Sequence, residues 1–350
     1  MVKSKEVQAL FLVTTLASAA MILMFSMLME ISYRDDDFLE SPQLKIDKLR
    51  VHGTASSLVE RLKMYKERYN YRPAEIFLDY EDTVDLCGDG PTFDPFFSLP
   101  MKFRSREDED LTIYNLFFNE TKNPTKGSIV EIGAFNGYKE SNSHFFNTCL
   151  GWETLLIEGN PSIYHKLLIN RPNAHRFNFV PTCTEEEEMA KKTIKFHAKS
   201  LTNAGLADGS VTTAYTELKL IPVVEVPCGS FTQVLLDCFP NGHVSFFSLD
   251  VEGSEPAVVA NIDFEKVFIE VMIIENWNLF CEVECESRNK YRKIMKEAGY
   301  IMFDNLVKKS DLFIHPLSKY LKVGESASAQ VYAPQMRFIK ESSSYIARSS

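Results

Sequence analysis

The chain has 350 residues, of which 45% are hydrophobic and 25% are charged, and its formal net charge at pH 7 is −10. This composition is ordinary for folded proteins and excludes bulk disorder, and the length leaves room for one large domain with additional segments. The acidic balance, with no basic run interleaved with aromatic residues, argues against nucleic acid as a partner.

The stretch from Val7 to Met29 contains no charged residue. It is longer than the ~20 residues that a helix needs to cross a bilayer. Lysines precede it, whereas Arg34 beyond it is followed at once by three aspartates. Since positive charge stays on the cytoplasmic side, we expect a cytoplasmic tail (1–6), a transmembrane signal-anchor (7–29) and a lumenal remainder. The sequence thus predicts a single-pass type II membrane protein of the Golgi or endoplasmic reticulum.

The alternative to an anchor is a cleaved signal peptide, because Ala17-Ser18-Ala19 is typical of a cleavage site. The apolar run continues past this site to Met29, beyond the usual length of ~7–15 residues for a signal sequence, which favours an uncleaved anchor. Asn119 begins an Asn-Glu-Thr sequon. A glycan on Asn119 is possible only if this part of the chain is lumenal, and we predict one there.

Residues 30–104 are predicted to form a stem and lead-in. Helical spacing of apolar residues occurs within Ser56 to Tyr69, and Tyr80 to Pro100 is rich in Asp, Gly and Pro, which favour turns.

The stretch from Ser128 to Pro161 reads as strand, glycine turn, helix and strand. Its first apolar run ends at a turn that begins with Gly133 and ends with Gly137, and the second ends at Glu158. In an open α/β sheet, ligands bind beyond the carboxyl ends of the strands, and an acid at the second strand end can accept hydrogen bonds from ribose hydroxyls. The pattern therefore indicates a nucleoside-containing cofactor.

The turn is not that of a dinucleotide-binding protein. Phe135 stands where the middle glycine of GxGxxG would lie, which opposes close contact with a pyrophosphate. Glu131, just before the turn, adds a negative charge that disfavours phosphate and tolerates a cation. S-adenosylmethionine (SAM) carries cationic sulfur and an ammonium group, so it suits this site.

Three segments in order, VEIGAFNGYKESNS, GWETLLIEGNPSIYHKLLINRPNA and FFSLDVEGSEPAVV, resemble the FkbM-type SAM-dependent methyltransferases. Similarity extends over residues 105–316, with Glu131 in place of the more usual aspartate. The resemblance implies a Rossmann-like class I methyltransferase sandwich with SAM as cofactor. The cofactor-binding residues that it implies are Glu131, Gly133, Phe135, Asn136, Gly137, Glu158 and Asp250.

Later segments continue the alternation of strand and helix. Further strands are expected at Thr193 to Lys199 and at Val223 to Pro227, and apolar runs predict buried parallel strands at Val244 to Leu249 and Val267 to Ile274. A terminal strand pair follows a helix that Gly299 closes. The predicted fold is an α/β sandwich with a mostly parallel sheet and a terminal antiparallel pair, preceded by one transmembrane helix. Residues 317–350 are predicted to be a loose tail.

Four carboxylates fall at predicted strand ends, namely Glu131, Glu158, Asp250 and Glu275. Like charges gathered at one edge cost energy unless a ligand or protons offset them, although some of these acids could simply cap helices. Methyl transfer requires a group that places the acceptor and removes its proton. We predict Asp250 as this base or orienting group, with Glu252 second. Asp250 with Glu275 and Asn276 could instead bind a divalent metal such as Mg²⁺.

All seven cysteines follow the predicted anchor, and none forms a CxxC pair, which argues against a zinc ribbon. In the lumen some are expected to form disulfides, and the odd total leaves at least one unpaired.

Two functions remain open at this point. The first is membrane-anchored O-methylation of a hydroxyl on a glycan or another secretory-pathway substrate. The second is a non-catalytic trafficking or interaction protein that keeps the methyltransferase fold, because fold alone does not fix function. Binding of SAM would separate the two.

Overall fold

The computed structural model describes residues 55–75, 93–94, 97–100, 103–119, 126–198, 205–206, 222–276 and 281–331. All of them belong to the second of two compact units, His52–Ser350. The predicted cytoplasmic tail and signal-anchor lie outside the described residues. Within the described ranges, no helix combines the length and the apolar character that crossing a membrane requires.

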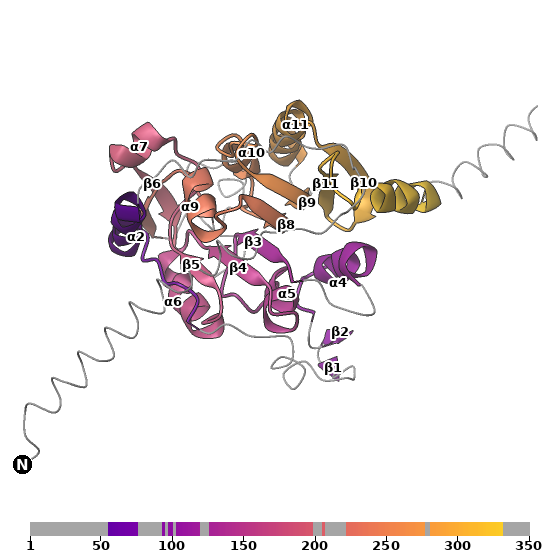
Figure 1. Ribbon diagram of the computed structural model, residues 1–350, viewed down its shortest axis with the longest axis horizontal. Coiled ribbons are helices and arrows are strands. Elements are labelled where there is room, and N and C mark those ends of the chain that lie inside the picture. The colour runs from indigo at the N-terminus through magenta and orange to yellow at the C-terminus, as the bar shows by residue number, and fades with distance from the viewer. Residues whose placement is uncertain are drawn as a thin grey trace, which may run out of the picture. The chain divides into compact units, whose positions relative to one another are not determined.

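A seven-stranded sheet occupies the centre of this unit (Figure 1). Its strands, in spatial order, are β10 (Ile301–Val307), β11 (Ser310–Ile314), β9 (Phe268–Glu275), β8 (His243–Leu249), β3 (Ser128–Ile132), β4 (Glu153–Ile157) and β5 (His175–Phe177). All neighbours pair in parallel except β11, which is antiparallel to both β9 and β10. The predicted mostly parallel sheet with a terminal antiparallel pair is therefore confirmed.

The strand order reverses at β3. The chain runs outward from β3 through β4 to β5 and then returns to the other side of β3 to form β8 and β9. In such sheets the two crossovers leave in opposite directions, which opens a crevice at the carboxyl ends of the two central strands. The fold thus places a ligand site beyond β3 and β8.

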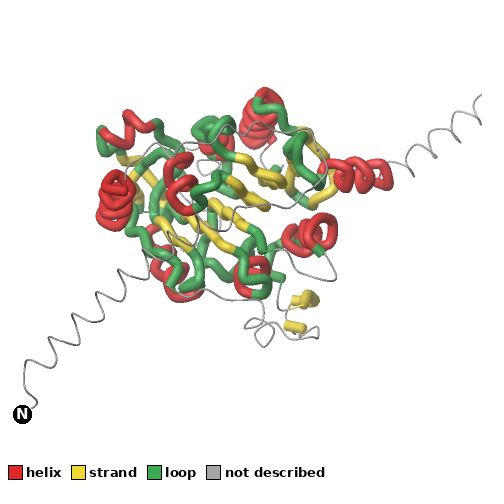
Figure 2. Tube along the Cα trace, in the orientation of Figure 1, coloured by secondary structure: helices red, strands yellow, loops and turns green. Residues whose placement is uncertain are grey.

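Helices cover both faces of the sheet, as the red tubes on either side of the yellow strands show (Figure 2). One face packs against α2 (Ala55–Arg68), α9 (Phe231–Cys238), α10 (Glu255–Val259) and α11 (Cys281–Glu297). The other packs against α4 (Glu109–Ile113), the π-helical turn η1 (Tyr114–Phe118), α5 (His144–Thr148) and α6 (Pro161–Asn170). The buried strands between these layers carry apolar residues on both faces, as central parallel strands require.

The helix predicted after the glycine turn is present as α5, and a loop separates it from the turn. Residues 133–143 form an irregular loop, and α5 starts only at His144. The loop contains the polar run Ser141-Asn142-Ser143, whose side chains bond to other groups and not to a helix. Such competition by Ser and Asn is the usual reason that a helix starts late.

The two strands predicted between residues 193 and 227 do not join the main sheet. They are β6 (Thr193–His197) and β7 (Val223–Pro227), which pair with each other as a separate antiparallel sheet. A short helix, α7 (Glu185–Met189), precedes them and starts with a capping box between Thr184 and Glu187. Its glutamates are not buried, in agreement with a solvated helix start. A further two-stranded sheet, β1 (Phe93–Asp94) with β2 (Phe97–Pro100), completes the strands.

The predicted stem helix is present as α2, but it packs inside the domain and not outside it. Tyr65 and Tyr69 on α2 are 1% and 0% exposed, and Tyr69 stacks on Phe179 with ring centroids 4.4 Å apart. Arg72 then pairs with Arg176 of β5 through two backbone hydrogen bonds. The domain therefore begins well before residue 105.

The predicted loose tail is also wrong in part. Residues 321–331 form a helix, and Tyr320 before it is 6% exposed. Its ring packs edge-on against Phe118, with centroids 5.0 Å apart. The domain therefore extends beyond residue 316 to at least residue 331.

Some of the described cysteines form disulfides. Cys183 and Cys228 are bonded to each other, Cys149 and Cys285 are also disulfide-bonded, and Cys238 among the described residues keeps a free thiol.

Candidate active site

A cavity opens at the carboxyl edge of the sheet, where the strand order reverses. Its floor is formed by the turn after β3 (Gly133 and Phe135), the end of β4 (Glu158), the end of β8 (Ser248 and Asp250) and the end of β9 (Glu275). Several residues that the sequence predicted for a cofactor site are thus brought together.

The turn after β3 depends on Gly133. Its φ is +88°, and a Cβ atom built there would lie 1.7 Å from the backbone oxygen of Asp250. Gly133 donates its N–H to the Ile157 carbonyl at the end of β4 (3.0 Å), and Asp250 donates its own to the carbonyl of Ile132 (3.1 Å). Only glycine allows the three strand ends to approach this closely.

Glu158 at the end of β4 holds the turn from the other side. Its Oε2 accepts a hydrogen bond from the Phe135 N–H (2.7 Å) and its Oε1 from the Asn160 N–H (2.6 Å). Burial raises the pKa of Glu158 to about 7, and the charge of Asp250 adds to the shift. Each carboxylate oxygen can accept a second hydrogen bond, so Glu158 keeps acceptor capacity towards the cavity that it lines.

Glu131, also predicted to bind the cofactor, is bonded to its own loop. It is 4% exposed and accepts hydrogen bonds from Ser141 Oγ (2.8 Å), Ser143 Oγ (2.5 Å) and the Asn142 N–H (2.7 Å). It does not line the cavity. The structure thus gives Glu131 the role of fixing the loop 141–143.

Asn136 and Gly137, predicted to bind the cofactor, shape the loop in a similar way. Asn136 Oδ1 accepts hydrogen bonds from the backbone N–H groups of Tyr138 and Lys139, which closes a turn. Gly137 has φ +72°, and a Cβ there would lie 2.6 Å from Cγ of Arg171 and 2.5 Å from Leu167. The missing side chain makes room for the neighbouring α6 end and not for a ligand.

Arg171 underlies this loop and was not foreseen from the sequence. It is 0% exposed, and its guanidinium donates to the carbonyl of Gly137 (3.1 Å), to Ser141 Oγ (3.3 Å) and to Asn147 Oδ1 (2.9 Å). Burial lowers the pKa of Arg171 to about 10, and the charge of Glu131 opposes that shift. Arg171 is therefore still charged at neutral pH and ties the loop to α5 and α6.

Asp250 and Glu275 form a carboxyl pair at the ends of β8 and β9. Their side chains share a hydrogen bond, which requires a proton between them. The pKa of Asp250 is raised to about 7, first because protein surrounds it and then because of other carboxylates, that of Glu255 foremost. Its side chain is nonetheless exposed within the open cavity, so water weakens this shift until a ligand fills the space.

For Glu275 the direction is the same, since burial and the charge of Asp250 raise its pKa well above the usual value. Four further acids line the cavity, among them Glu252 and Glu109. Glu252, the second predicted catalytic residue, follows Asp250 with φ +56°. Glu109 on α4 is 8% exposed and accepts the Glu107 N–H (2.8 Å), and burial raises its pKa. The cavity is therefore predominantly acidic at its floor.

The arrangement considered for a divalent metal is not assembled. The side chain of Asn276 is directed to Asp311, to which Nδ2 donates (2.8 Å), and that carboxylate also bonds to Arg292. No group of three or more His, Cys, Asp or Glu side chains within the described ranges is placed to hold a metal ion.

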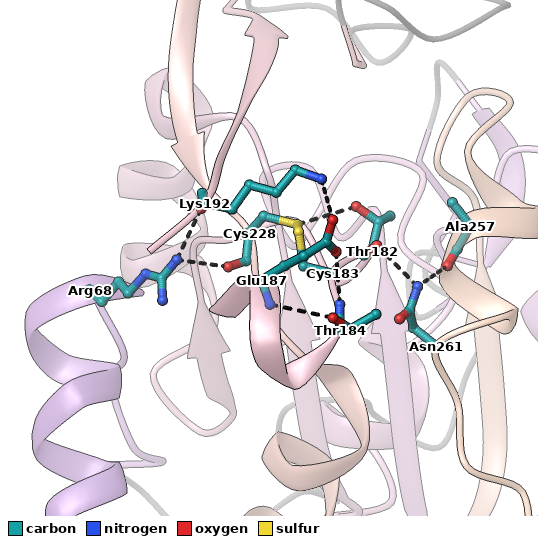
Figure 3. A network of polar contacts seen from close by, with 9 residues as sticks. All are labelled: Arg68, Thr182, Cys183, Thr184, Glu187, Lys192, Cys228, Ala257 and Asn261. Atoms are coloured by element: carbon teal, nitrogen blue, oxygen red, sulfur yellow. Dashed lines mark hydrogen bonds and ion pairs between the residues drawn. A yellow bond between two sulfur atoms is a disulfide. The ribbon is translucent and has the colours of Figure 1, made fainter. Parts of the chain in front are cut away.

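The wall opposite Asp250 follows β5. Thr182 lines the cavity, and its carbonyl accepts a hydrogen bond from Asn261 Nδ2 (3.0 Å). The next residue, Cys183, is tied to Cys228 after β7, whose carbonyl accepts from Arg68 of α2 (2.9 Å; Figure 3). The disulfide and these bonds hold the wall against both α2 and the loop after α10.

The sequence of residues 131–302 matches the family described as the methyltransferase FkbM domain. This segment runs from the end of β3 to the start of β10, and so contains the turn, both carboxyl-bearing strand ends and the wall described above. The segment is similar to the methyltransferase FkbM domain. It accounts for just under half of the chain. No curated protein matches the chain.

Solved structures with which the chain aligns include several methyltransferases. An O-methyltransferase from Bacillus cereus, solved in complex with SAH, is 13% identical, with 75% of this chain and 92% of that chain covered and a TM-score of 0.32. The precorrin-6y C5,15-methyltransferase of Geobacter metallireducens is 11% identical, with 66% and 93% covered and a TM-score of 0.31.

Three side chains near the cavity escaped prediction from the sequence. Asn142 and Glu109 line it, and Arg171 supports its loop. For Asn142 a signal existed, since the polar run Ser-Asn-Ser interrupts an otherwise apolar helical pattern. Glu109 and Arg171 reach the site through tertiary packing, which leaves no local pattern.

Proposed function

We propose that the protein transfers a methyl group from SAM to a hydroxyl group of a glycan or another secretory-pathway molecule. The observation that supports this most is the pairing of Glu158, at the end of β4, with the carboxyl pair of Asp250 and Glu275 across the same cavity. Glu158 is placed to bind a nucleoside, and the carboxyl pair of Asp250 and Glu275 is suited to removing a proton.

The residues present fit SAM. Glu158 can accept hydrogen bonds from ribose hydroxyls while its backbone partners hold it in place. The acidic floor favours a ligand with positive charge, and SAM supplies an electrophilic methyl group on a cationic sulfur. Carboxylates with raised pKa values are typical of such functional sites.

Asp250 would act as the general base. A hydroxyl is a weak nucleophile until its proton is removed, and Asp250 can accept that proton as the oxygen gains the methyl group. The carboxyl of Glu275, hydrogen-bonded to it, holds the orientation of Asp250. The FkbM domain thus supplies both positioning and proton transfer in one cavity.

Replacing Glu158 by Ala is expected to weaken SAM binding by about 1.5–3 kcal/mol, the range for a lost hydrogen bond to a charged group. Calorimetry at pH 8, above the pKa of this carboxyl, would measure it. Glu153→Ala is the matched control, because Glu153 is exposed at the opposite end of the same strand. If the parent binds SAM and Glu158→Ala binds it equally well, Glu158 does not contact the cofactor.

The same titration of the parent protein tests the alternative of a non-catalytic role. A protein that only retains the fold has no need to bind SAM. Absence of SAM binding by the parent would exclude the proposed methyl transfer.

We propose the secretory pathway as the location, with the FkbM domain in the lumen. The apolar stretch 7–29 and its flanking charges support this topology, and so do the disulfides, which persist in oxidising compartments. Asn119 is exposed at the end of η1, where a glycan has room.

Endoglycosidase treatment of the protein from cells is therefore expected to increase its gel mobility, and Asn119→Gln should abolish the shift. Protease added to intact vesicles should leave the FkbM domain uncut. Digestion of the domain from the cytoplasmic side would contradict the topology.

A further inference from the structure

Asn142 has a fixed position in the cavity wall. It lies in the loop between β3 and α5 and lines the cavity. Its backbone N–H donates to Oε1 of Glu131 (2.7 Å), and the hydroxyls of both flanking serines donate to Oε2 of the same carboxylate. Glu131 thus fixes three consecutive residues through hydrogen bonds, which restricts the conformations of the Asn142 side chain.

In the amide side chain of Asn142, the nitrogen has a hydrogen-bond partner and the oxygen has none. Its Nδ2 donates to the hydroxyl of Ser248 on β8 (2.9 Å), and Ser248 also lines the cavity. Its Oδ1 is buried and has no hydrogen-bond partner. A buried acceptor without a donor is costly, so a native structure that keeps one usually meets it with a ligand or water.

The surrounding charge selects the kind of donor. Ser248 is followed two residues later by Asp250, which pairs with Glu275 at the floor of the cavity, and buried Glu131 stands behind the loop. Three cations also line the cavity, but seven carboxyl groups do, so an ammonium group is favoured there over a carboxylate. The oxygen of Asn142 therefore suits a cationic N–H donor.

Building on the proposed function, we infer that Asn142 Oδ1 accepts a hydrogen bond from the α-ammonium group of bound SAM. Asn142 bonds to β8 on one side of β3, and Glu158 ends β4 on the other. The amino-acid part of the cofactor would then lie towards β8 and its ribose towards β4. Asn142 is thereby assigned as the residue that recognises the amino acid.

The test compares ligands with and without that amino acid. Calorimetry with SAM, S-adenosylhomocysteine and 5′-methylthioadenosine, which lacks the amino acid, would be run on the parent and on Asn142→Leu. We expect Asn142→Leu to bind the first two about 10- to 100-fold more weakly, the loss for a hydrogen bond to a charged group, and to bind 5′-methylthioadenosine as the parent does.

Two further variants complete the design. Asn142→Asp keeps an acceptor oxygen and should retain the parental affinity for SAM. Asn241→Leu is the matched control, because Asn241 Oδ1 accepts the N–H of His243 at the start of β8, at the opposite edge of the sheet. It should change none of the three affinities.

Equal weakening of all three ligands by Asn142→Leu would overturn the inference, since it would show a loss of loop structure only. Unchanged binding of SAM would overturn it as well. In both cases the proposed function would stand, because the parent binds SAM. If the parent bound none of the three ligands, the proposed function would fall, and this inference with it.

Discussion

Asp250→Asn is expected to lower turnover on a verified acceptor by about 10²- to 10⁴-fold, the usual worth of general-base assistance, while SAM affinity stays near that of the parent. Asparagine keeps the shape of the side chain and cannot take up a proton. Turnover would be measured with radiolabelled SAM, and affinity by calorimetry on the same preparation.

The pH dependence gives a second readout for Asp250. Only the ionised carboxyl can accept a proton, so the parent's turnover should rise as the pH increases through about 7, the pKa to which the site raises this group. Asp263→Asn, at a partly exposed position outside the cavity lining, serves as the control and should keep both the rate and the profile. Turnover of Asp250→Asn at the parental rate would remove Asp250 from the mechanism.

Arg171→Met is expected to lower the free energy of unfolding by about 3–5 kcal/mol, the cost of removing one member of a buried charged network. Without the guanidinium, the carbonyl of Gly137 and the side-chain oxygen of Asn147 lose their buried donor. Urea denaturation followed by circular dichroism would measure the change. SAM binding should also weaken, because the same loop carries Asn142.

Lys166→Met tests whether loss of a cation as such matters, because Lys166 is exposed on α6, five residues before Arg171. It should change stability by less than about 0.5 kcal/mol, as is usual at surface sites. A change below 1 kcal/mol for Arg171→Met would show that the loop does not depend on this network.

The sheet could be predicted because its signals are local. Apolar runs such as Val244 to Leu249 are buried on both faces, and a single strand shows this in its own sequence. Which strands pair with each other could not be predicted in this way. Nothing within β6 or β7 shows that they pair with each other and leave the main sheet, since that depends on the partners available at the edge.

The site was predictable to a similar extent. Strand ends placed Glu158 and Asp250 at one cavity, because carboxyl ends of parallel strands share an edge. The roles of Glu131 and Gly137 could not be read in the same way, because a motif gives residue types and not the direction of side chains. Glu131 faces its own serines, and Gly137 makes space for Arg171.

The position of β11 has a consequence for where the protein can be cut. The family match ends at residue 302, yet β11 (Ser310–Ile314) comes later and lies between β9 and β10. A fragment of residues 131–302 would lack the strand that joins these two, and it would also lack Tyr69, which covers Phe179. We therefore expect that a fragment able to fold alone needs α2 and β11 in addition to the family segment, and that the segment by itself cannot be exchanged between proteins.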